Sequence, residues 1–195
     1  MSKIVAIFLL ILTSQTMASE IQGKITKFSG FTVESHKPYS YIAIQTKDGQ
    51  RIQLPNWILP SENNNLLKST VSVDGMVSPI LCTDMSSACS TGYLKDIRSF
   101  KINFPIVSNI AFSKYSSRLE KFSGRTIETG NPFSYIAIND KIKVAVPNFL
   151  NATELLKNNV EMTVEGKANI LACTDMSSAC SPAEISPLKS VEIKF

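Results

Sequence analysis

The sequence predicts an all-β protein built from two tandem copies of one small unit, each copy with five strands and one short helix. Three observations carry this prediction. Several short segments recur in the same order about 90 residues apart. Each copy contains stretches in which apolar and polar residues alternate, and turn residues such as Asp48-Gly49 separate these stretches.

The duplication is visible as identical short segments. Residues 27–30 (KFSG) recur at 121–124, 40–44 (SYIAI) recur at 134–138, and 82–90 (CTDMSSACS) recur letter for letter at 173–181. The order is the same in both copies, so a tandem duplication explains the matches better than chance does. The sequence therefore predicts a first domain at 19–103, a linker at 104–116 and a second domain at 117–195, each with its own core.

Residues 1–18 have the pattern of a secretory signal peptide. Lys3 gives a positive start, residues 4–12 form an unbroken apolar run, and residues 16–18 offer small side chains for cleavage. The run is about half the length that a membrane-spanning helix requires. We therefore expect a mature chain that begins at Ser19 and is periplasmic or secreted.

In the first copy, alternation places three strands at 21–33, at 39–45 and around Ile52. Gly23 and Gly30 mark bends in the first of them. The core-facing residues of the second and third strands are expected to be Ile42, Ile44 and Ile52. The outward-facing residues are expected to be Tyr39, Tyr41, Ala43, Arg51 and Gln53.

The second copy repeats this parity around a shorter turn at Asn139-Asp140. Its expected inward residues are Ile142, Val144 and Val146. Its expected outward residues are Phe133, Tyr135, Lys141 and Lys143.

A short helix, a fourth strand and a fifth strand complete each copy. The helices are expected at 61–68 and 151–157, where Asn151 and Glu154 have the spacing of a capping box. The fourth strands are expected at 71–73 and 162–164, ending at Gly75 and Gly166. The fifth strands are expected at 93–102 and 188–195.

This order of strands and helix resembles the OB-fold, a five-stranded Greek-key barrel. The motifs behind the resemblance are a glycine-bent first strand and a fourth strand ending at glycine, and they span nearly all of 20–102 and 117–195. Small exported bacterial OB domains are the nearest group. The resemblance implies that the loop between strands four and five flanks a ligand-binding face.

The four cysteines form two Cys-x6-Cys loops. Pairing Cys82 with Cys89 and Cys173 with Cys180 is one of three possible connectivities, and it gives each copy its own staple. Closing such a loop contributes about 2.5 kcal/mol. A redox-active pair usually has Cys-x-x-Cys spacing, and zinc ligation also fits the spacing and an oxidising compartment poorly. We expect no cofactor and no metal.

The loop between the cysteines is identical and polar in the two copies. Gene conversion, or a tight turn that tolerates few residues, would explain this identity without any ligand. Contact of both copies with the same kind of partner would explain it as well. One carboxylate among hydroxyls falls short of a calcium site. The candidate contact residues are Asp84, Met85, Ser86, Asp175, Met176 and Ser177.

The outward residues of strands two and three combine aromatic rings with cations. The candidate ligand-binding residues among them are Tyr39, Tyr41, Arg51, Tyr135 and Lys143. Such a surface suits stacking together with charge pairing, as single-stranded nucleic acid or an acidic glycan requires. Cross-strand Tyr and Lys or Arg are also common on ordinary sheet surfaces. The mature chain carries nineteen Lys and Arg against sixteen Asp and Glu, a mild excess that argues against nucleic acid.

Motifs typical of enzymes are missing. The sequence has no nucleophile elbow, no phosphate-binding glycine loop and no metal-binding histidine pair. His36 lies in the first loop, where the other copy has Gly130, so it is expected to be an exposed residue without a shared catalytic role. Trp57, aligned with Phe149, is expected in the core.

The sequence therefore predicts an exported, non-catalytic binding protein with two equivalent faces for an extended polymer or peptide. The expected partner is a protein, a peptide or an acidic polymer of the cell envelope. The alternative is a structural subunit or an inhibitor that engages a protein through the stapled loops.

Overall fold

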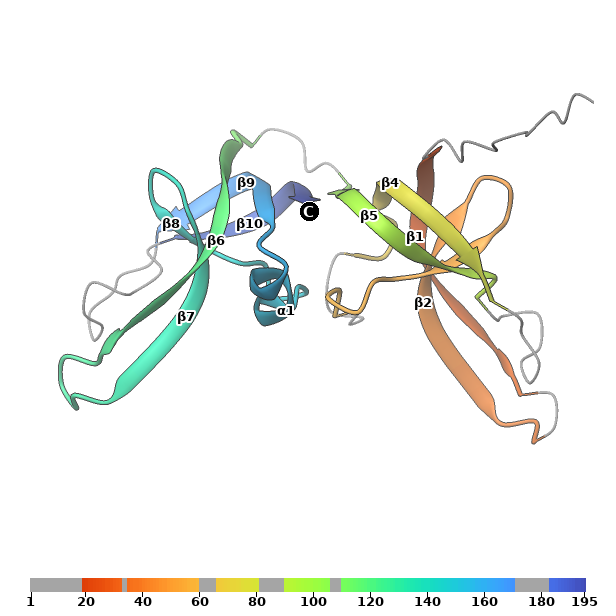
Figure 1. Cartoon of the computed structure of the whole chain (residues 1–195), viewed down its shortest axis with the longest axis horizontal. Helices are drawn as coiled ribbons and strands as arrows, with labels where there is room; N and C mark the ends of the chain where they lie inside the picture. Colours follow the sequence, from red (N-terminus) through yellow and green to blue (C-terminus); the bar gives the residue numbers. More distant parts are fainter. Residues whose placement is uncertain (1–18, 33–34, 60–65, 81–89, 106–109, 171–182) are drawn as a thin grey trace, which may run out of the picture.

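The computed structural model describes residues 19–32, 35–59, 66–80, 90–105, 110–170 and 183–195. The predicted signal peptide, all four cysteines and the polar loop residues between them lie outside these ranges. Within the described residues the chain is all-β with one short helix, which confirms the predicted all-β class (Figure 1).

The first half contains β1 (Ser19–Phe31), β2 (Pro38–Thr46), β3 (Arg51–Gln53), β4 (Thr70–Pro79) and β5 (Gly92–Asn103). The second half contains β6 (Ser113–Arg125), β7 (Pro132–Asn139), β8 (Lys143–Ala145), α1 (Ala152–Lys157), β9 (Glu161–Ile170) and β10 (Ala183–Lys194). Because β6 begins at Ser113, the last four residues of the predicted linker belong to a strand.

The strands of each half pair in the same closed circuit. In the first half β1 pairs with β2 and β4, β2 pairs with β3, β4 pairs with β5, and β3 runs parallel to β5. In the second half β6, β7, β8, β10 and β9 repeat this order, and β8 runs parallel to β10. Pairing of β5 with β10 joins the two circuits into one ten-stranded sheet.

The core lies where the predicted inward residues face one another. Ile44, Ile52 and Val144 are fully buried, as alternation predicts, and Ile42, Ile142 and Val146 are partly buried and pack against the core. Ala43 was expected on the outward face but is also fully buried, so that expectation was wrong. Burying an aliphatic side chain contributes about 1.5–3 kcal/mol, so this parity fixes which face of each strand turns inward. The buried residues of the two halves form one hydrophobic cluster.

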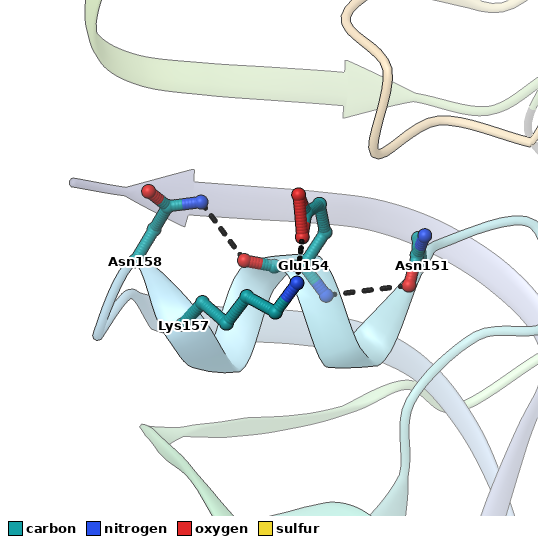
Figure 2. Close-up of polar contacts among 4 residues, drawn as sticks. All are labelled: Asn151, Glu154, Lys157 and Asn158. Atoms are coloured by element: carbon teal, nitrogen blue, oxygen red, sulfur yellow. Dashed lines mark hydrogen bonds and ion pairs between the residues drawn. The ribbon is translucent and has the colours of Figure 1, made fainter.

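Helix α1 begins at the predicted N-cap (Figure 2). The Asn151 side chain accepts a hydrogen bond of 3.2 Å from the backbone N–H of Glu154. In a full capping box, the Glu154 side chain would also accept a hydrogen bond from the backbone N–H of Asn151. Here that N–H donates to the Trp57 carbonyl instead. The Glu154 carboxylate instead pairs with Lys157 at 3.0 Å. In the first half, residues 61–65 of the predicted helix lie outside the described residues, and 66–68 form a turn.

The fourth strands extend past the glycines that were expected to end them. Strand β4 continues beyond Gly75 to Pro79, and β9 continues beyond Gly166 to Ile170. A Cβ atom at Gly166 would lie 2.4 Å from Ile185 Cγ2 and 2.6 Å from the Pro187 carbonyl oxygen. The prediction was wrong because this glycine permits close approach of the neighbouring strand at an irregularity in the ladder, rather than a turn.

Replacing Gly166 with alanine should lower the free energy of unfolding by about 1–3 kcal/mol, because the added methyl group overlaps a neighbouring backbone oxygen. Gly49→Ala is the control, since its Cβ meets nothing within 4 Å and its cost comes from a positive φ of 86° alone. Urea denaturation measures both variants. A Gly166→Ala variant as stable as the parent would contradict close packing at Gly166.

Candidate functional site

The structure places two equivalent sets of aromatic and cationic side chains on the sheet. The first strip consists of Phe28, Tyr39, Tyr41 and Arg51, and the second strip consists of Phe122, Tyr135 and Lys143.

Strand register explains why the first strip faces away from the core. Phe28 pairs directly with Tyr41, and three positions further along the ladder Ile25 pairs with Ile44. Because side chains alternate along a strand, an offset of three residues puts the two pairs on opposite faces. Ile25 and Ile44 are buried in the core, so Phe28 and Tyr41 lie on the opposite face of the strands, where both are half-buried.

The rings of the first strip stack in sequence and end at a cation. The centroids of Phe28 and Tyr41 lie 5.5 Å apart with an interplanar angle of 28°. Tyr39 and Tyr41 follow at 6.4 Å and 23°. Arg51 Cζ lies 4.8 Å from the Phe28 centroid, which is a cation–π contact.

The second strip has the same geometry. Phe122 and Tyr135 stack at 5.4 Å with an interplanar angle of 27°. Lys143 Nζ lies 4.5 Å from the Phe122 centroid, so it occupies the position that Arg51 has in the first strip. Arginine and lysine differ in hydrogen-bonding geometry but share their charge, and charge is therefore the property common to the two strips.

Each strip also contains a buried phenol. The hydroxyl oxygens of Tyr41 and Tyr135 are shielded from solvent, and neither has a hydrogen-bond partner among the residues that the structure describes. Burial raises the pKa of Tyr135 above its ordinary value, because it penalises the phenolate. The Tyr135 hydroxyl is therefore neutral at physiological pH, and it is a buried donor without a partner among the described residues.

The strips bring together the aromatic and cationic residues that the sequence suggested, namely Tyr39, Tyr41 and Arg51 in one half and Tyr135 and Lys143 in the other. Phe28 and Phe122, which anchor each cation, were missed. The signal that could have found them is the repeated segment KFSG, in which both rings occur.

The remaining candidates are His36 and the loop residues between the cysteines. His36 is exposed in the loop before β2 with a φ of 50°, as expected for a residue aligned with Gly130, whose φ is 66°. The loop candidates Asp84, Met85, Ser86, Asp175, Met176 and Ser177 lie outside the described residues. Within those residues, no cluster of three or more His, Cys, Asp or Glu has the arrangement of a metal site.

Of the chain that the structure describes, no helix has the length and apolar character needed to cross a membrane. Comparison with models of known protein families found no match. Comparisons with curated proteins and with solved structures found no match either.

Proposed function

We propose that the chain is an exported, non-catalytic binding protein in which two OB-like barrels each present one aromatic and cationic strip to an extended acidic polymer or peptide. The closed strand circuit in each half, with its parallel third and fifth strands, supports the five-stranded Greek-key barrel. The signal-like residues 1–18 support export.

The observation that carries the binding role is the recurrence of one geometry in both halves. A stacked pair of rings with a cation over the outer ring occurs at 5.5 Å and 4.8 Å in the first strip, and at 5.4 Å and 4.5 Å in the second. The stacked ring pairs lie in segments that recur unchanged, 27–30 at 121–124 and 40–44 at 134–138. The cation beside them differs, Arg51 in one half and Lys143 in the other, yet it keeps the same place over the phenylalanine ring, which supports positive charge as the shared property of the strips.

The chemistry of the strips favours a planar or sugar-like ligand with negative charge. Stacked rings offer an apolar platform to a sugar ring, a base or a side chain, and the cation beside them attracts carboxylate or phosphate groups. We favour an acidic glycan or acidic peptide over nucleic acid because the net positive charge is only +4 for the whole chain.

Removing both cations tests this proposal. Arg51→Ala combined with Lys143→Ala should weaken binding of an acidic oligosaccharide about fivefold to thirtyfold, because each site loses a cation held beside its rings. Binding should also become less sensitive to salt. Lys47→Ala combined with Lys141→Ala removes exposed cations outside the strips and should change affinity little.

A panel of ligands keeps the result specific. Titration calorimetry with an acidic oligosaccharide, an acidic peptide and a single-stranded oligonucleotide of matched charge ranks the three classes. If the strip variant and the control variant weakened ligand binding equally, the loss of affinity would come from the change in net charge. That result would contradict a binding site at the strips.

A second candidate uses the stapled loops, and the identity of residues 82–90 with 173–181 favours it. Asp84→Ala combined with Asp175→Ala should leave stability within about 0.5 kcal/mol of the parent if the loops contact a partner. Capture of that partner should then fall more than twofold. A lower melting temperature with normal capture would make the aspartates turn formers.

A further inference from the structure

The two halves contact each other through equivalent residues. Residues 57–59 of the first half align with 149–151 of the second. The backbone N–H of Leu59 donates to the Phe149 carbonyl at 2.7 Å, and the N–H of Asn151 donates to the Trp57 carbonyl at 2.8 Å. Each half thus donates one backbone hydrogen bond to the other half and accepts the equivalent bond from it, on either side of the β-bridge between Ile58 and Leu150.

The last strands of the halves show the same reciprocity. With β5 aligned to β10, Phe104 corresponds to Phe195. The N–H of Phe104 donates to the Lys189 carbonyl at 2.9 Å, and the N–H of Phe195 donates to the Arg98 carbonyl at 3.0 Å. Arg98 and Lys189 are likewise aligned positions.

The aromatic contacts across the interface are also reciprocal. Trp57 lies 5.7 Å from Phe195, and the aligned pair Phe149 and Phe104 lies 5.7 Å apart. Contacts in which residue i meets j and the equivalent of j meets the equivalent of i define an isologous, two-fold interface. The halves are arranged as the two subunits of a symmetric dimer would be.

The two-fold axis passes through one residue pair. In the ladder between β5 and β10, Lys101 lies opposite Glu192, and these two residues occupy aligned positions of the repeat. In a dimer of identical units this position would face its own copy. Lys194 also lies near Glu192, at 3.6 Å, and is the other charge facing that carboxylate on its own strand.

We infer that the interface between the halves is a dimer interface held within one chain, and that Lys101 opposite Glu192 directs the pairing of unlike halves. Two first halves would place lysine against lysine on the axis, and two second halves would place glutamate against glutamate. Like charges directly opposite each other in a ladder are destabilising, whereas the unlike pair is favourable. The surface therefore fits a second copy of this chain when the charges on the axis are alike within each chain but unlike between the two chains. This inference is independent of the proposed ligand.

Charge reversal in the full chain tests the inference. Lys101→Glu and Glu192→Lys should each lower the melting temperature by about 2–4 °C, and the double variant should regain most of that loss. Lys47→Glu, in an exposed turn, is the control and should melt like the parent.

Mixing the two single variants gives the sharper readout. Each variant has like charges on its own axis, but exchange of halves between the two chains places glutamate opposite lysine at both axes. Light scattering should therefore find heterodimers in the equimolar mixture and monomers in the double variant. A mixture with the same mass as the separate variants, or a double variant no more stable than the singles, would overturn the inference.

Discussion

Replacing Trp57 with alanine should lower the free energy of unfolding by about 3–5 kcal/mol, the cost of removing a large buried ring. Trp57 is only 4% exposed and packs edge-on against Phe100 at 5.0 Å, within its own half. Its ring also contacts Phe195 of the other half. The loss should therefore loosen a core and the interface at once, and the melting temperature should fall by roughly 10 °C.

The matched control is Leu59→Ala, two residues away and 45% exposed, which should cost much less. Far-UV circular dichroism in urea is the measurement, because Trp57 is the sole tryptophan and fluorescence would be lost with it. One cooperative transition at lower urea is the expected result. If half of the circular dichroism signal of the variant unfolded at the same urea concentration as in the parent, the halves would fold independently. That result would contradict a shared core.

Replacing Phe28 and Phe122 together with alanine should weaken binding of an acidic oligosaccharide about tenfold to 100-fold, since a stacking ring contributes about 1–3 kcal/mol by alanine substitution. Each ring is the surface under the strip's cation and the partner of its tyrosine. Its removal unstacks the platform and releases the cation. Titration calorimetry below the unfolding transition measures the change.

Phe31→Ala is the control for this pair of substitutions. Phe31 lies at the end of the same strand as Phe28, is 58% exposed, and aligns with Arg125 rather than with another ring. Its loss removes aromatic surface outside the strips and should leave affinity within about twofold of the parent. A Phe31 effect as large as the paired effect would mean that general apolar surface, rather than the strips, holds the ligand.

Much of this fold follows from local rules that a sequence displays. Alternation placed Ile44, Ile52 and Val144 inward because a one-residue slip would expose every buried side chain of a strand. The N-cap at Asn151 was predictable because capping depends on residues three positions apart.

The features that the sequence did not reveal depend on contacts far along the chain. Gly75 and Gly166 have the appearance of strand ends, and only the partner strands make them sites of irregular pairing. Phe28 became part of the strip through its pairing with Tyr41, which no local pattern fixes. The interface required Lys101 and Glu192 to meet across the two copies.

The presence of one strip in each half has a consequence for the ligand. Linking two segments that each bind one strip would raise the apparent affinity through effective concentration.

Stoichiometry tests the two equivalent strips most directly. Titrating the full chain with an acidic oligosaccharide short enough to cover one strip should give two equivalents of similar affinity. Arg51→Ala or Lys143→Ala alone should leave one equivalent at the parental affinity and one weakened site, and the double variant should weaken both. A parental stoichiometry of one, or a single substitution that abolishes all binding, would contradict two equivalent sites.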